Sequence, residues 1–310
     1  MVAVDPGDFG AAASAGIAAL VGPLGADVIT LDRDAAAPPE AEVLVTMPTD
    51  RASLTRTLSP GIRWVHALAA GVDGFPFDLV GECTLTCSRG ASAGAIAEFV
   101  LAAMLSFEKD LPAQWLHEPP ARWNFARLGG LAGRTLGLVG LGAIGTETAR
   151  RALAFDMAVS AVRRTGAPSP VAGVTITRDL PTLLAGSDHV VVAAPATPAT
   201  RHLLDRRAFD AVKPGAHLVN VSRGSLVDQE ALIAALDDGR VAMASLDVVD
   251  PEPLPAGHPL YAHSRVHLSA HVSWSSPETG RRTLELFADN FRRYRAGEVL
   301  RGVVDVDAGY

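Results

Sequence analysis

A glycine pattern within residues 135–153 sets the strictest limit on the fold of this chain. Its three glycines stand as G-x-G-x-x-G, directly after an apolar segment with strand composition and before a segment with helix composition. The first glycine allows a tight turn, the second lets the backbone approach a pyrophosphate, and the third lets the helix pack closely on the strand. The pattern predicts a dinucleotide-binding βαβ unit, with a glycine turn that serves packing only as the alternative. The residues predicted to bind the dinucleotide are Gly140, Gly142, Ala143, Ile144 and Gly145.

The residues after the next expected strand indicate which dinucleotide is bound. A chain that binds NAD usually has an acidic residue near the end of this strand, where its carboxylate holds the ribose 2′-hydroxyl. Here residues 158–162 are followed by Arg163, Arg164 and Thr165, so no carboxylate stands at this position. Guanidinium groups can bind a 2′-phosphate through paired hydrogen bonds. The sequence therefore favours NADP(H) over NAD(H), and two solvated arginines in a loop are the alternative.

Strands and helices alternate on both sides of this motif. The chain has 310 residues, more than one typical domain of ~150–250 residues, and 48% of them are hydrophobic. We therefore predict an α/β protein with two doubly wound parallel-sheet domains. The expected strands are 26–31, 41–47, 63–71, 83–88, 135–140, 158–162, 174–177, 189–195, 217–222, 242–248 and 265–272. The expected helices are 11–20, 50–58, 91–108, 143–155, 199–212, 228–238 and 277–296.

Charge and cysteine content exclude several classes of protein. There are 27 Lys and Arg against 34 Asp and Glu, a net charge of −7, so the chain lacks the basic character of a nucleic-acid-binding protein. No apolar run approaches the ~18 residues of a membrane span, and the first residues do not resemble a signal peptide. Cys83 and Cys87 are the only cysteines, and we interpret them as reduced core residues. We expect a cytoplasmic protein with no membrane and no nucleic-acid partner.

Four residues in the second half of the chain lie at, or shortly after, the ends of successive expected strands. They are Arg223, Asp247, Glu252 and His271. Reduction of a 2-keto acid needs such a set: an arginine to bind the carboxylate, a protonated histidine to protonate the carbonyl, and a carboxylate to keep that histidine charged and oriented. Taken singly, each residue has a structural alternative as a surface loop residue, a solvated acid or a core histidine. His263 and His267 compete with His271 by position.

Six segments of this chain resemble one known family, the D-isomer-specific 2-hydroxyacid dehydrogenases. The resemblance covers residues 60–296 in collinear order. The matching segments are WVHALAAGVDG at 64–74, TLGLVGLGAIG at 135–145, TPATRHLLDRRAF at 197–209, NVSRGSLVDQEAL at 220–232, LDVVDPEPLP at 246–255 and SAHVSW at 269–274.

The resemblance implies a role for each matching residue. It makes Arg223 the catalytic arginine that binds the substrate carboxylate, Glu252 the partner of the histidine, and His271 the general acid and base. Asp247 would contact the nicotinamide carboxamide, and Pro195 would complete the cofactor site. The backbone of Ala70, Gly71 and Val72 would bind the substrate carboxylate.

This sequence also departs from the family at two places. Arg163 stands where the family has an aspartate, which agrees with NADP(H). Many members have a Gly-Gly pair after the histidine, whereas this chain has Ser273 and Trp274, and Trp274 would narrow the mouth of the substrate site.

The family architecture implies how the two domains are arranged in sequence. Residues 1–98, completed by about 285–310, would form a flavodoxin-like substrate-binding domain, and residues 99–284 a Rossmann NAD(P)-binding domain inserted into it. Trp115 and Trp123 lie in the helix and arm at 99–130, through which a homodimer is expected.

The resemblance also implies a reaction. We expect an enzyme that uses NADPH to reduce a small anionic 2-keto acid, of the glyoxylate or hydroxypyruvate type, to the D-2-hydroxy acid. The alternatives are an NAD-dependent D-2-hydroxyacid dehydrogenase and a non-catalytic, dinucleotide-sensing protein of the corepressor kind.

Overall fold

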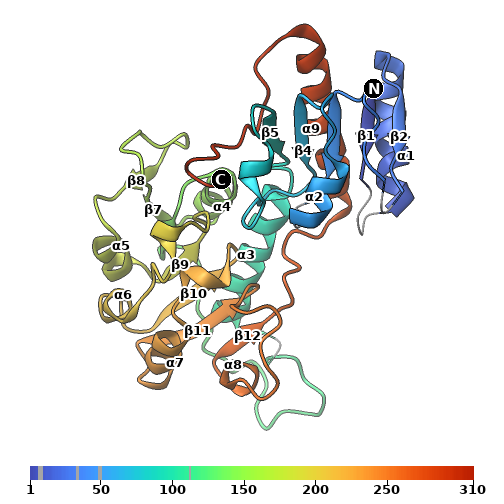
Figure 1. Cartoon of the computed structure of the whole chain (residues 1–310). Coiled ribbons are helices and arrows are strands. Elements are labelled where there is room, and N and C mark those ends of the chain that lie inside the picture. The colour runs from blue at the N-terminus through green and yellow to red at the C-terminus, as the bar shows by residue number, and fades with distance from the viewer. Residues whose placement is uncertain (6–9, 33–34, 48–50, 112) are drawn as a thin grey trace. The chain divides into compact units, whose positions relative to one another are not determined.

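The computed structural model describes residues 1–5, 10–32, 35–47, 51–111 and 113–310, and the chain divides into two compact units (Figure 1). The first unit comprises Met1–Ser92 and Ser276–Tyr310, and the second unit comprises Ala93–Ser275. Each unit contains one parallel β-sheet with helices packed against it, as the alternation of apolar strands and helices predicts. The expected α/β fold with two parallel sheets is confirmed.

The first unit has a five-stranded parallel sheet in the order β2-β1-β3-β4-β5, the flavodoxin-like order. One apolar core is formed by the sheet with helices α1 and α9, and it includes Phe287 and Phe291 of α9. A second apolar core covers the opposite face of the sheet. The strands are β1 (Val2–Val4), β2 (Val28–Thr30), β3 (Val43–Thr46), β4 (Trp64–Ala67) and β5 (Thr84–Cys87). The helices are α1 (Gly10–Val21), α2 (Arg51–Thr57) and α9 (Pro277–Ala296), with short 3₁₀ turns η2 (Gly22–Leu24) and η3 (Phe77–Leu79).

The second unit has a seven-stranded parallel sheet in the order β12-β11-β10-β9-β6-β7-β8. The chain reverses its direction of winding between β6 and β9, which is the Rossmann arrangement. The strands are β6 (Thr135–Val139), β7 (Ala158–Val162), β8 (Val174–Ile176), β9 (His189–Val192), β10 (Ala216–Asn220), β11 (Val241–Leu246) and β12 (Val266–Leu268). The helices are α3 (Ala93–Lys109), α4 (Ala143–Ala154), α5 (Leu180–Gly186), α6 (Arg206–Asp210), α7 (Gln229–Asp237) and α8 (Pro259–Ala262), with 3₁₀ turns η4 (Pro198–Thr200) and η5 (Gly224–Leu226).

The unit boundaries fall at the beginnings of two helices. The α3 helix packs against α4 and α9 packs against α1, so each helix belongs whole to one unit. The boundaries expected after residues 98 and 284 instead fall inside α3 and α9. None of the helices in the described ranges is long and apolar enough to cross a membrane.

Several short elements differ from the sequence-based expectation. The helix expected over 199–212 is wrong in its middle, because residues 202–204 pair with 225–228 in a parallel bridge and Asp205 caps the start of the shorter α6. The strand β1 and the helices α5 and α8 were not expected. The expected helix at 50–58 appears as α2, and residue 50 lies outside the described residues.

Buried polar side chains in the second unit contact one another in series. The His189 ring contacts Glu108 Oε1 through Nε2 (3.1 Å) and His217 Nδ1 through its own Nδ1 (3.2 Å). The His217 Nε2 atom contacts the Ser245 hydroxyl at 3.0 Å. Burial lowers the pKa of both histidines, for His189 despite the adjacent Glu108 carboxylate. A consistent assignment has Ser245 donating to a neutral His217, His217 donating to a neutral His189, and His189 donating to Glu108.

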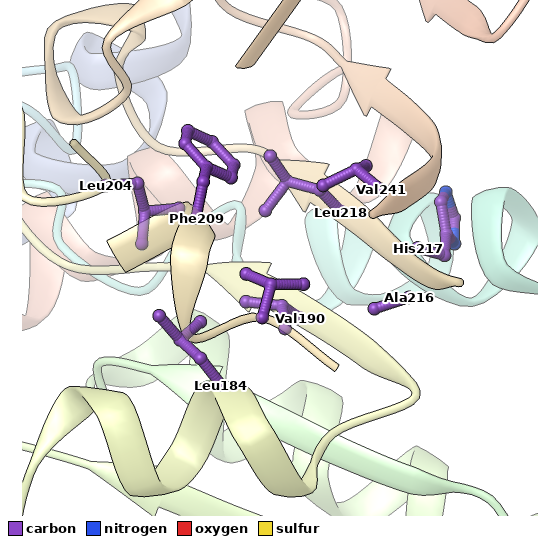
Figure 2. A pocket seen from close by; sticks show the side chains of 9 residues that line it. Leu184, Val190, Leu204, Phe209, Ala216, His217, Leu218 and Val241 are labelled. Atoms are coloured by element: carbon purple, nitrogen blue, oxygen red, sulfur yellow. The ribbon is translucent and has the colours of Figure 1, made fainter. Parts of the chain in front are cut away.

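A pocket beside His217 is part of the apolar packing of the second unit (Figure 2). Apart from the His217 ring, side chains from α5, α6 and strands β9 to β11 line it, among them Leu184, Phe209 and Leu218. No charged side chain occurs among the described residues that line it. This pocket therefore offers nothing to bind an anionic substrate.

His66 makes the first unit sensitive to acid. Its ring is fully buried between the hydroxyls of Thr86 (2.7 Å) and Ser88 (3.2 Å), and burial lowers the pKa of His66 to about 3. The unfolded chain, with a histidine pKa of about 6.5, binds this proton more readily, so stability is lost as the pH falls below that value.

We expect His66→Gln to reduce the pH dependence of stability. Glutamine can still hydrogen-bond to the two hydroxyls but does not titrate. Between about pH 7.5 and about pH 5.5 the loss of unfolding free energy should be about 1.4 kcal/mol smaller in the variant than in the unmodified protein. Urea titrations at the two pH values measure this difference, and an equal loss in both proteins would contradict the assignment.

Candidate active site

The glycine turn after β6 has the geometry that a dinucleotide requires. Gly140 has φ +103°, and a Cβ there would lie 2.8 Å from the Ala193 carbonyl carbon. A Cβ at Gly145 would lie 2.4 Å from the Gly140 carbonyl oxygen, so the start of α4 packs directly on the turn. At Gly142 no heavy atom of the described residues, chain neighbours aside, lies within 4 Å of the Cβ position. The first and third glycines are thus required by packing, while the second leaves its backbone open to a ligand.

The N-terminus of α4 fits an anionic group. Gly142 is its N-cap and has no side chain to accept hydrogen bonds from the first turn, and Ala143, Ile144 and the following two residues include no acid. The unpaired N–H groups and the helix dipole therefore favour a pyrophosphate here. The residues present fit a dinucleotide.

Two arginines follow β7 on the same edge of the sheet. Arg163 is half-buried and its guanidinium donates to the Pro168 carbonyl (3.1 Å), while Arg164 and Thr165 are exposed. Pro195 follows β9 and is also exposed; its carbonyl accepts a hydrogen bond from Thr200 (2.8 Å). Because all strands of this sheet are parallel, these residues and the glycine turn follow strand ends that lie on one edge.

Arg223 lies in the segment that follows β10, and that segment is held by its neighbours. The Asn220 side-chain amide donates to the Arg223 carbonyl (2.9 Å) and accepts from the Ser222 N–H (3.1 Å). The Ser222 hydroxyl donates to the carbonyl of Ala194, which joins this segment to the end of β9. Asn220 and Ser222 were not among the predicted site residues, although their place beside Arg223 in the segment NVSRG was a signal for such a role.

The segment that carries Glu252 packs on the arginine segment. A Cβ at Gly224 would lie 1.9 Å from the Val249 carbonyl carbon, so only glycine allows the two backbones to approach this closely. Glu252 Oε1 accepts from the Val249 N–H (3.2 Å). This packing brings the segments of Arg223 and Glu252 together.

His271 contacts Glu252 directly. Its Nδ1 atom lies 2.8 Å from Glu252 Oε2, and the two side chains are 38% and 37% exposed. The pairing leaves Nε2 as the ring nitrogen that can pass a proton to a substrate. His263 also has a carboxylate partner, the exposed Asp237 (3.3 Å), but it precedes β12, and His267 is exposed on β12 itself. His271 differs from both because it follows the end of β12 and its partner Glu252 lies on the segment packed against that of Arg223.

Asp247 holds the loop that carries His271. The expected strand over 265–272 ends at Leu268, and the next residues turn around the buried Asp247 carboxylate. Its oxygens accept hydrogen bonds from the Ser269 hydroxyl (2.6 Å) and from the backbone N–H groups of Val272 (2.9 Å) and Ser273 (2.9 Å). The His271 N–H donates to the Asp247 carbonyl (2.8 Å). These bonds hold His271 at φ +53°, a conformation that is unfavourable for residues other than glycine.

The remaining expected site residues are placed as follows. The Trp274 indole N–H donates to the His271 carbonyl (2.9 Å), and the side chain is largely exposed beside the loop. Ala70, Gly71 and Val72 follow β4 in the first unit; Ala70 and Gly71 are partly exposed to different degrees and Val72 is buried. Their part in substrate binding stays a prediction.

Comparison with known proteins agrees with this geometry. A sequence model of the D-isomer specific 2-hydroxyacid dehydrogenase NAD binding domain matches residues 101–273. A glyoxylate reductase of Thermofilum pendens is 36% identical over 71% of this chain and 68% of its own length, and one of Korarchaeum cryptofilum is 32% identical over 87% of each. A Xanthobacter autotrophicus family member, solved with NADPH and MES, is 30% identical, with a TM-score of 0.87 over 100% of this chain and 99% of its own.

The chain therefore belongs to the D-isomer-specific 2-hydroxyacid dehydrogenase family. It is an NAD(P)-dependent oxidoreductase that acts on 2-hydroxy and 2-keto acids. The expected family and enzyme class are confirmed.

We expect Asp247→Asn to destabilise the His271 loop. An amide has one acceptor oxygen and would turn its NH₂ group toward a hydroxyl or N–H donor, leaving buried donors unpaired. The free energy of unfolding should fall by roughly 2–4 kcal/mol. Asp237→Asn is the control, because that side chain is 69% exposed and its loss should cost no more than about 0.5 kcal/mol. Similar urea midpoints for the two variants would contradict this role of Asp247.

Proposed function

We propose that this chain uses NADPH to reduce a small 2-keto acid, of the glyoxylate or hydroxypyruvate type, to the D-2-hydroxy acid. The observation that carries the proposal is the 2.8 Å contact between His271 Nδ1 and Glu252, on a segment packed against that of Arg223. The named activity of the Thermofilum and Korarchaeum relatives supports the same substrate class.

His271 supplies the proton. In the reducing direction its protonated imidazole donates from Nε2 to the keto oxygen as that oxygen becomes a hydroxyl. Glu252 accepts from the Nδ1–H, which fixes the ring orientation and offsets the imidazolium charge. The bound dinucleotide would supply the hydride.

Arg223 binds the substrate. Its planar guanidinium can hold a carboxylate through two parallel hydrogen bonds and polarise the adjacent keto oxygen. Ala70, Gly71 and Val72 would add backbone N–H donors, and Trp274 would restrict the size of the substrate side chain. The substrate is therefore a short, anionic keto acid.

Arg163, Arg164 and Thr165 support the choice of NADPH. They follow β7, where an acid would hold an unphosphorylated ribose, and the two arginines carry the charge that a 2′-phosphate needs. The Xanthobacter relative was solved with NADPH, which agrees with this choice.

We also propose a homodimer through residues 99–130. Apolar side chains stand exposed on the arm that follows α3, and large aromatic residues of this kind anchor protein interfaces. They are Trp115, Leu116, Trp123, Phe125 and Leu128.

The cofactor preference is tested by assaying glyoxylate, hydroxypyruvate and larger 2-keto acids with NADPH and NADH in parallel. We expect NADPH to be favoured by roughly 30- to 1000-fold in kcat/KM, which corresponds to about 2–4 kcal/mol of phosphate contacts. Arg163→Asp should shift the preference toward NADH. Arg150→Ala, which removes an exposed arginine from α4, should leave it unchanged. Equal efficiency of the unmodified enzyme with both cofactors would overturn the assignment of the 2′-phosphate site.

The acid–base and substrate roles are tested by substitution. We expect His271→Ala to lower kcat by roughly 10²- to 10⁴-fold with NADPH binding retained, whereas His263→Ala should have a mild effect. Reduction should slow as the pH rises, because it consumes the imidazolium form, and Glu252→Gln should move that decline to lower pH. Arg223→Lys keeps the charge but loses the paired geometry, so kcat/KM for the keto acid should fall strongly. Normal turnover by His271→Ala would place the acid elsewhere.

A further inference from the structure

The Gln229 side chain holds the backbone of Asp250 at both polar groups. Its Nε2 donates to the Asp250 carbonyl at 2.6 Å, and its Oε1 accepts from the Asp250 N–H at 3.4 Å. Gln229 is the first residue of α7, six residues after Arg223, whereas Asp250 lies in the segment that follows β11. One side-chain amide therefore links the segments of the two neighbouring strands.

Asp250 is close in sequence to the carboxylate that contacts His271. Glu252 lies two residues further on, and its Oε1 accepts from the N–H of Val249, directly before Asp250. The Val249–Asp250 peptide packs on Gly224. A displacement of Asp250 thus moves the backbone on which Glu252 depends.

The start of α7, which carries Gln229, is held firmly in place. Asp228 caps α7 by accepting from the N–H groups of Glu230 and Ala231, both at 3.1 Å, and the inner face of the helix is buried through Leu232 and Leu236. The side chain of Asp250 has a further partner in Arg201, at 3.4 Å, but both are exposed, and such an ion pair contributes little. The Gln229 donation to the Asp250 carbonyl is shorter (2.6 Å), and both amide contacts are partly buried.

We propose that Gln229 is a positioning residue that sets Glu252 against His271 and fixes their segment relative to that of Arg223. The inference rests on the proposed function of Glu252 and His271. Gln229 itself touches no reacting atom in this scheme: it acts through the Asp250 backbone. Its loss should loosen the carboxylate and so weaken its hold on the imidazolium.

The experiment compares Gln229→Leu with the unmodified enzyme. Leucine has a similar size but makes neither hydrogen bond. We expect kcat for reduction to fall roughly 10- to 100-fold, because small displacements of catalytic groups have effects of this size. The decline of reduction with pH should begin at lower pH, as in Glu252→Gln, and KM for NADPH should stay within about twofold, since the dinucleotide turn is not involved. Glu230→Gln, at the exposed neighbouring position, should behave like the unmodified enzyme.

A double variant separates a positioning role from a merely structural one. If Gln229 acts through Glu252, then Gln229→Leu combined with Glu252→Gln should be no more than about twofold slower than Glu252→Gln alone. Penalties that multiply, or an unchanged pH profile in Gln229→Leu, would overturn the proposal. Gln229→Glu, which keeps the size and loses the donor, serves the same comparison if the leucine variant does not fold.

The same variants distinguish failure of this proposal from failure of the proposed function. If Glu252→Gln retains full activity and an unchanged pH profile, the acid–base assignment itself is wrong. If Glu252→Gln is impaired and Gln229→Leu is not, the function stands and Gln229 has no positioning role.

Discussion

The Asp247 carboxylate is the constraint on which the rest of the site depends. It is 1% exposed, and a buried charge is tolerated only where donors surround it. Those donors are the Ser269 hydroxyl and the backbone N–H groups of Val272 and Ser273, all within one five-residue loop. Satisfying the carboxylate therefore fixes the loop, and the loop holds His271 in its left-handed conformation toward Glu252. Asp247 has a structural role here whether or not it also touches the cofactor.

Much of the fold could be predicted because buried parallel strands are long apolar runs. The segments at 135–141 and 190–194 are such runs, and the glycine turn after the first predicts a dinucleotide-binding domain. The strand β1 was not expected, although it lies between β2 and β3 in its sheet. The helix expected over 199–212 was wrong because residues near 203 pair with a distant segment, and composition carries no sign of that pairing.

The site was predictable in its residue types and not in its contacts. Parallel strands all end at one edge, so Arg223, Glu252 and His271 had to follow neighbouring strand ends. That Glu252 meets His271 across 19 residues depends on the packing of Gly224 under Val249, which no spacing rule gives. The role of Gln229 was not predicted for a similar reason. A glutamine at the start of a helix is common, and its contact with the Asp250 backbone is seen only in the structure.

Two of the histidine–carboxylate pairs of the second unit, His189–Glu108 and His271–Glu252, show why residue type alone does not assign a proton-transfer role. His189 and Glu108 are 3.1 Å apart and His271 and Glu252 are 2.8 Å apart, so the contacts are alike. The first pair is buried near the beginning of β9, where desolvation outweighs the attraction of the carboxylate and keeps the ring neutral. The second pair follows the carboxyl ends of the strands, and more than a third of each side chain is exposed. There the ring can exchange a proton with a substrate, so burial, rather than the carboxylate partner, separates the core pair from the candidate catalytic pair.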